Sequence, residues 1–175
     1  MATKKSIWIL IGIAVIMAWL LGSATQAGAE TYTVKWRTTG HYPKMHVIEV
    51  GDVPGHIVYG GEVAGVVSCD DGSVGTYAAK FIGELDKGSG KSQGYGLTTH
   101  EDGSTQWIKF QQTVKPDPDG KTTSWEGTFE YIKGTGRFEG IQGSGTFTFK
   151  RLAPIPGVGA QFFSDNTGTY TLPSK

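Results

Sequence analysis

The most specific feature of this sequence is a glycine-rich stretch at residues 131–147, which reads YIKGTGRFEGIQGSGTF. Its first two glycines, Gly134 and Gly136, allow a tight turn in which a side chain would obstruct the backbone. Phe138 is placed to pack beneath that turn, and three later glycines let the next segment coil closely past its neighbour. The stretch therefore predicts two consecutive β-strands joined by a short turn.

Segments with the composition of β-strands alternate with turn sequences on both sides of this stretch. The Asp-Gly pairs at 71–72 and 102–103 readily supply the positive φ that hairpin turns require. Residues 115–120 are too rich in proline and glycine to be anything but a loop. The expected strands lie at residues 31–38, 45–50 (after a connection that contains histidine and proline), 57–68, 74–85, 91–99, 105–114, 122–132, 143–152 and 162–172.

This spacing is typical of an all-β antiparallel meander, and the composition excludes a mainly helical protein. Of the 27 glycines, 24 follow residue 29, and each glycine inside a helix costs about 1 kcal/mol relative to alanine. We predict a closed or nearly closed antiparallel up-and-down barrel of about eight strands, because closure protects the sheet edges. An outer-membrane barrel shares the strand pattern, but the polar segment at 91–99 and the C-terminal Leu-Pro-Ser-Lys disfavour it.

The first 29 residues have the layout of a secretory signal peptide. Two lysines precede an apolar run at 7–21, and small residues end at a cleavage site after Ala29. The run is shorter than the roughly 20 residues of a spanning helix, so cleavage is favoured over an uncleaved anchor. We therefore expect a signal-peptide helix at 1–29 and one β-barrel domain at 30–175. The product is expected to be exported, to the periplasm or the extracellular space, with no stable membrane span after cleavage.

Charge and motif content exclude several classes of function. The chain after residue 29 has 14 basic and 16 acidic residues and no lysine and arginine cluster that would bind nucleic acid. The sequence GSGKS at 88–92 lacks the first glycine of a phosphate-binding loop, and no dinucleotide-binding fingerprint is present. We therefore expect no cofactor and no nucleic-acid partner.

The residue pattern also contains no metal site and no standard catalytic site. The four histidines, His41, His46, His56 and His100, match no metal-ligand spacing, and no nucleophile elbow occurs. Cys69 is the only cysteine, so no intramolecular disulfide can form. We interpret it as a small buried apolar residue, the alternatives being a nucleophile or an intermolecular bridge. We expect neither a bound metal nor catalytic residues.

The glycine-rich stretch resembles the signature hairpin of the allene-oxide-cyclase-like barrels. This calycin-like superfamily is similar to the plant dirigent proteins and to exported bacterial proteins of unassigned function. Its hairpin has a Gly-Thr-Gly-x-Phe turn before a glycine-rich strand, as Gly134-Thr-Gly136-Arg-Phe138 does here. The resemblance implies an exported bacterial member with an eight-stranded barrel over residues 30–175, and the plant enzymes are often oligomeric. It implies no activity, because members range from cyclisation and stereochemical guidance to no known activity.

Aromatic residues occur on most of the expected strands. Barrel cores bury such rings routinely; the functional alternative is a lumen or mouth that binds an apolar or planar molecule. We predict an exported, non-catalytic barrel that binds a small hydrophobic molecule or acts as an interaction module. The aromatic residues are Trp36, Tyr59, Tyr77, Tyr95, Trp107, Trp125, Phe129 and Tyr131. The candidate ligand-binding residues are His56, Tyr59, Glu62, Cys69, Trp107 and Trp125.

Two further interpretations stay open at this point. The first is a cyclase or isomerase whose active site lies in the barrel lumen, where Cys69, His56 and Glu62 are the first residues to test. Convergence of at least two of them in one pocket would favour this enzyme, and scattered surface positions would count against it. The second is a homo-oligomer whose role is assembly.

Overall fold

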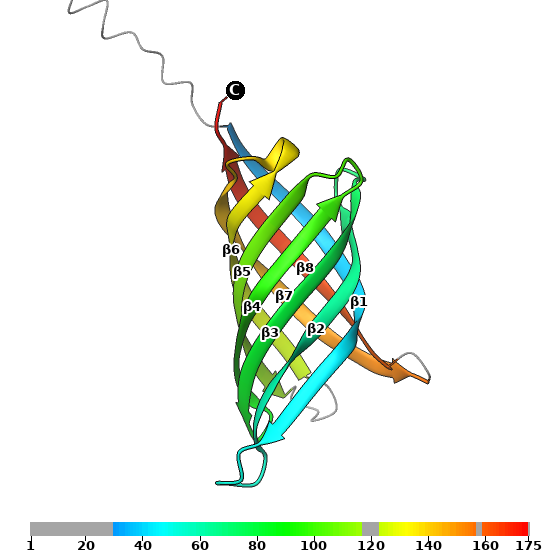
Figure 1. The fold of residues 1–175 in the computed structure, drawn as a ribbon, viewed down its shortest axis with the longest axis vertical. Coiled ribbons are helices and arrows are strands. Elements are labelled where there is room, and N and C mark those ends of the chain that lie inside the picture. The colour runs from blue at the N-terminus through cyan, green and yellow to red at the C-terminus, as the bar shows by residue number, and fades with distance from the viewer. Residues whose placement is uncertain (1–29, 117–122, 157–158, 175) are drawn as a thin grey trace, which may run out of the picture.

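The computed structural model describes residues 30–116, 123–156 and 159–174. They form eight long strands and one short 3-10 helix, which wrap into a barrel (Figure 1). The elements are β1 (Glu30–Glu49), β2 (His56–Cys69), β3 (Val74–Asp86), β4 (Ser89–His100), β5 (Thr105–Pro116), β6 (Thr123–Thr135), η1 (Gly136–Phe138), β7 (Gln142–Ile155) and β8 (Gly159–Leu172).

Each strand pairs antiparallel with the next one in the chain, and β1 pairs with β8 to close the barrel. This confirms the predicted all-β, closed, up-and-down barrel of eight strands. Within the described residues, no helix is long and apolar enough to cross a membrane. The signal-peptide helix, its cleavage site and the export of the chain fall on residues 1–29, outside the described ranges, and stay predictions.

The largest difference from the sequence prediction is that residues 31–38 and 45–49 belong to a single strand, β1. The expected connection between them is a bulge in β1, where the pairing with β2 shifts register between His41 and Lys44. Pro43 lies inside this shift, where its missing N–H breaks no ladder hydrogen bond. The pairing of β1 with β8 ends at the same point, at His41 and Gln161, so the lower half of β1 departs from β8.

The glycine-rich stretch forms the end of β6, the helix η1 and the start of β7, as the predicted strand-turn-strand requires. Gly136 has a φ of 62°, a conformation that favours glycine. Phe138 is buried at 6% exposure, and its ring lies 6.0 Å from that of Tyr170. This turn therefore fixes one end of the barrel, which we call the upper end because it is uppermost in Figure 1.

Aromatic rings in the interior lie over glycines of the neighbouring strand. Phe110 is directly paired with Gly94, and a Cβ added to Gly94 would lie 2.7 Å from the Phe110 ring. Phe129 of β6 pairs in the same way with Gly145 of β7, where an added Cβ would overlap the ring. The absence of a side chain at these positions makes room for large rings inside a narrow barrel.

Candidate functional site

The interior of the barrel contains a partly open cavity of about 200 Å³. Most of its wall is apolar, and aromatic rings from seven of the eight strands contribute to it. The rings that line it are Trp36, Tyr42, Tyr59, Tyr77, Phe81, Phe110, Trp125, Phe129, Tyr131, Phe147, Phe149 and Phe162. The interior is therefore a partly hollow chamber with a wall suited to a planar apolar molecule.

One polar group in this chamber has no internal partner. The hydroxyl of Tyr59 is buried and makes no hydrogen bond to any other described residue. The whole residue is only 8% exposed, and its ring packs edge-on against Phe81 with centroids 5.8 Å apart. A buried hydroxyl without a partner costs about 1–3 kcal/mol, so this group is available to a molecule that enters the chamber.

The lower end of the chamber lies where β1 leaves β8. Tyr42, in the bulge of β1, packs against Phe162 with ring centroids 5.7 Å apart. The guanidinium carbon of Arg151 lies 5.9 Å from the centre of the Tyr42 ring. Burial raises the pKa of Tyr42, and the charge of Arg151 opposes that rise, so Tyr42 stays neutral at physiological pH while Arg151 is cationic. This end therefore combines aromatic rings with one positive charge.

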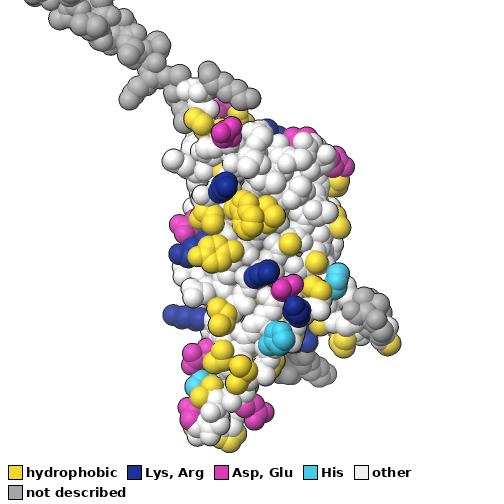
Figure 2. Space-filling model, viewed as in Figure 1, with side chains coloured by type: hydrophobic (Ala, Val, Ile, Leu, Met, Phe, Trp, Pro, Cys, Tyr) yellow, Lys and Arg dark blue, Asp and Glu magenta, His cyan; other side chains and the backbone are white. Residues whose placement is uncertain are grey.

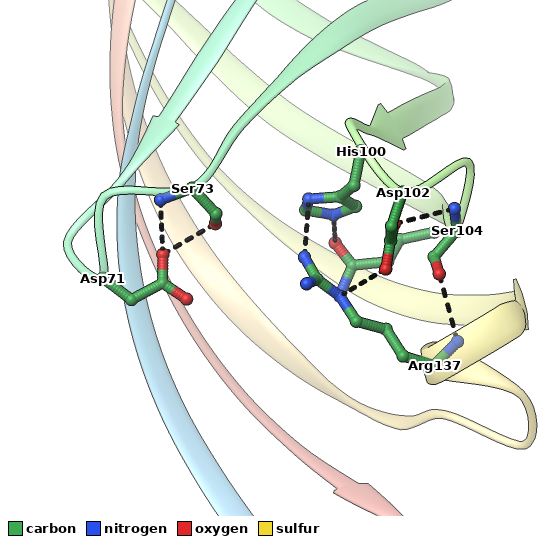
Figure 3. Close-up of polar contacts among 7 residues, drawn as sticks. Asp71, Ser73, His100, Asp102, Ser104 and Arg137 are labelled. Atoms are coloured by element: carbon green, nitrogen blue, oxygen red, sulfur yellow. Dashed lines mark hydrogen bonds and ion pairs between the residues drawn. The ribbon is translucent and has the colours of Figure 1, made fainter.

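The upper end holds a second, more polar cavity of about 360 Å³. Trp36, Thr98, Gln106 and Tyr131 line both cavities, so the two are adjacent through a shared wall. Asp71 of the β2–β3 turn lies across this opening from His100 and Arg137 (Figure 3). The upper opening is thus the polar side of the site and the chamber is the apolar side.

A chain of hydrogen bonds crosses the upper cavity. Arg137 donates to Nδ1 of His100 at 3.2 Å, and His100 donates from Nε2 to Oε1 of Gln106 at 3.1 Å (Figure 3). This arrangement requires a neutral imidazole with its proton on Nε2. Arg137 also lies 3.6 Å from Asp102. The chain fixes the orientation of the Gln106 amide, which faces the chamber.

The titratable groups at this opening are held in definite states. Hydrogen bonds from the Ser73 hydroxyl and backbone N–H keep the pKa of Asp71 below its usual value, so Asp71 is a carboxylate. Burial raises the pKa of the Cys69 thiol, which therefore stays protonated and weakly nucleophilic. This agrees with the interpretation of Cys69 as a small apolar side chain at the end of β2.

The six candidate ligand-binding residues are not brought together. Tyr59 and Trp125 line the chamber, whereas Cys69 lines the upper cavity. Trp107 is 38% exposed and Glu62 lies 3.5 Å from Lys80 on the outside of the barrel, which Figure 2 shows as a mixture of hydrophobic and charged side chains. His56 lies at the lower end beside Asp52 and Glu84.

The enzyme hypothesis built on Cys69, His56 and Glu62 therefore has no common pocket. Among the chamber residues that the sequence did not single out are Tyr42, Arg151 and Gln106. Strand alternation could have identified Arg151, because it shares a face with Phe147 and Phe149, but the sequence did not say which face was inside.

His56 joins the β1–β2 loop to β3 through both ring nitrogens. Nδ1 lies 2.7 Å from the Asp52 carboxylate and Nε2 lies 2.8 Å from that of Glu84, contacts that require a protonated ring with both N–H groups donating. These hydrogen bonds, with that to Glu84 first and that to Asp52 second, raise the pKa of His56. The stability that they contribute is complete below the unfolded pKa of about 6.5 and is lost as pH rises through the folded pKa.

We therefore expect His56→Gln to destabilise the barrel more at pH 6 than at pH 9. Urea unfolding at both pH values measures this, with His46→Gln, at an exposed position of β1, as the matched control. Equal losses at pH 6 and pH 9 would contradict the proposed role of His56 as a charged link.

The chain was compared with protein-family models, curated proteins and solved structures. No family model and no curated protein matches the chain. Among solved structures, the pterocarpan synthase dirigent protein GePTS1 has a TM-score of 0.47 at 14% identity over 82% of this chain and 92% of that one. The pterocarpan synthase dirigent protein PsPTS1 has a TM-score of 0.43 at 13% identity over 85% and 98%. Both of these solved structures are named dirigent proteins.

Proposed function

We propose that this protein binds a small, largely apolar molecule inside its barrel. The observation that carries this proposal is the chamber of about 200 Å³ with its aromatic wall. An engineered protein cavity of about 150 Å³ with an apolar lining binds benzene, so this chamber has room for one or two fused rings. Binding of this kind needs no catalytic group.

The energetic cost of the chamber supports a binding role. Side chains around an unfilled apolar cavity lose the dispersion contacts that a packed core would give them, and this loss grows with the volume of the cavity. A barrel with a purely structural role would be more stable with the space filled, whereas a bound molecule would recover much of the loss.

Binding of a neutral aromatic molecule tests this proposal. We expect 2-naphthamide to bind and to change the fluorescence of Trp36 and Trp125, which line the chamber. Ile108→Trp, which fills the chamber from β5, should weaken binding at least tenfold. Ile132→Trp is the matched control, because Ile132 is 47% exposed on the outside, and it should bind like the parent protein.

Calorimetric titration gives the affinities, and circular dichroism establishes that both variants are folded. Equal affinity in the parent, Ile108→Trp and Ile132→Trp proteins would place the bound molecule outside the chamber and overturn the proposal. The proposal would also be overturned if neither 2-naphthamide nor the related acid, 2-naphthoate, bound to the parent protein.

A cyclase or isomerase remains the second candidate, with a site different from the three residues first considered. The observation in its favour is the polar group of Asp71, His100 and Arg137 at the upper opening. A carboxylate base that faces a guanidinium across an opening can move a proton within a substrate bound between them. Such a reaction conserves mass, so a bound compound recovered with unchanged mass but altered chromatographic retention would support the enzyme. Asp71→Asn should then abolish the change.

A further inference from the structure

The chamber has a single ionised side chain in its wall. Arg151 is the only lysine, arginine, histidine or carboxylate among its described lining residues. Burial raises the pKa values of Tyr42, Tyr77 and Tyr131, so these tyrosines are neutral at physiological pH. The one ionised group in this wall is therefore a positive charge at the lower end, on a side chain that is also exposed to solvent.

Arg151 is not neutralised by a carboxylate within the described part of the chain, where no ion pair includes it. Its described contact is with the face of the Tyr42 ring at 5.9 Å, which leaves the guanidinium donors available. An apolar wall with one cation at its exposed lower end favours a molecule that brings one negative charge.

The unpartnered hydroxyl of Tyr59 is an independent observation from the same region. Tyr59 and Tyr42 both pack edge-on against Phe81, with ring centroids 5.8 Å and 6.3 Å from that of Phe81, and Arg151 lies over the Tyr42 ring. Tyr59 can donate one hydrogen bond and Arg151 can donate two in a fork. Together they suit a carboxylate: the two N–H groups of Arg151 can donate to its two oxygens, and the Tyr59 hydroxyl can donate a further hydrogen bond to one of them.

We propose that the molecule bound in the chamber is a compact aromatic carboxylate whose acid group is held by Arg151 and Tyr59. This inference rests on the proposed binding function and names its ligand class. The ring system lies among the aromatic residues deeper in the barrel, such as Phe81 and Phe110. The size of the chamber favours one or two rings over a long acyl chain, and its single cation matches a monoanion better than a phosphate dianion.

The experiment compares 2-naphthoate with 2-naphthamide, which has nearly the same shape but no charge. At pH 7.5 we expect the acid to bind roughly 10 to 100 times more tightly than the amide, the range for hydrogen bonds to a charged group. If both bind equally, the carboxylate assignment is wrong while the binding proposal stands. If neither binds, the binding proposal itself fails.

Substitutions then locate the acid group. Arg151→Gln and Tyr59→Phe should each reduce the preference for the acid over the amide, and Arg151→Gln should remove most of it. Lys150→Gln is the matched control, because Lys150 is the adjacent residue on the opposite face of β7, is exposed like Arg151, and loses the same charge. A loss of preference as large in Lys150→Gln as in Arg151→Gln would show a general charge effect and overturn the assignment.

Discussion

Replacement of Phe162 by alanine is expected to lower the free energy of unfolding by about 3–5 kcal/mol. Phe162 is 1% exposed, and its ring is stacked on that of Phe149 with centroids 4.8 Å apart. It also packs edge-on against Tyr42 at the point where β1 leaves β8. The substitution removes from β8 a ring that contacts both β7 and β1, and it enlarges the chamber. The lost burial of the ring and the larger cavity both lower the free energy of unfolding.

The neighbouring residue provides a matched control for this prediction. Phe163 points to the outside of β8, where its ring lies 5.5 Å from the guanidinium carbon of Arg37. Phe163→Ala should cost about 1 kcal/mol, since the ring is only partly buried on the outer face and a cation–π contact there is weak. Urea unfolding of both variants gives the comparison. Similar losses for Phe162→Ala and Phe163→Ala would contradict the assignment of the inner and outer faces of β8.

The second large effect is expected from Gly145→Ala, which should lower the free energy of unfolding by about 1–3 kcal/mol. A Cβ at this position would overlap both the ring of Phe129 and the backbone oxygen of Thr167. Phe129 is 3% exposed and packs against Trp36 and Tyr131, so its ring cannot move freely. The added methyl group therefore forces a shift in the closely packed wall.

Ser144→Ala is the control for this substitution, because Ser144 is the adjacent exposed residue and its change should be nearly neutral. A double-mutant cycle isolates the clash with the ring: Gly145→Ala should cost less in a Phe129→Leu background than in the parent protein. Strict additivity of the two substitutions would mean that the ring of Phe129 does not restrict this glycine.

Much of the fold could be predicted from the sequence because its turns have strong local chemistry. Asp-Gly pairs marked two hairpin turns, and the 131–147 stretch marked a third connection. The long strand β1 was the exception, since Pro43 is read locally as a break. The bulge that accommodates it depends on pairing with β2 and β8, which are distant in the chain.

The site was less predictable, because strand alternation gives two faces but does not say which one is inside. Trp125 lines the chamber and Trp107 lies on the outside, although both are tryptophans in strands of similar composition. Arg151 follows the aromatic alternation of β7, and its place in the chamber depends on closure of the whole barrel. Arg151 is itself exposed, so its burial would not have distinguished it from the other surface charges; only its position on the inner face of β7 does.

The ligand interpretation accounts for several features with one cause. The rings over glycines create a wall, the chamber leaves space within it, and Tyr59 and Arg151 supply donors at one end. A barrel with a fully packed core would have no use for the unpartnered Tyr59 hydroxyl and the Arg151 guanidinium in its wall. Association of several copies into an oligomer stays a prediction and is independent of this account.

A crystal structure of the protein under xenon pressure tests the central claim most directly. Xenon enters dry apolar cavities of this size, so we predict xenon density inside the barrel, among side chains such as Val63, Phe110 and Phe129. Ile108→Trp should remove that density. An interior filled by side chains or by ordered water, with no xenon bound there, would contradict the account.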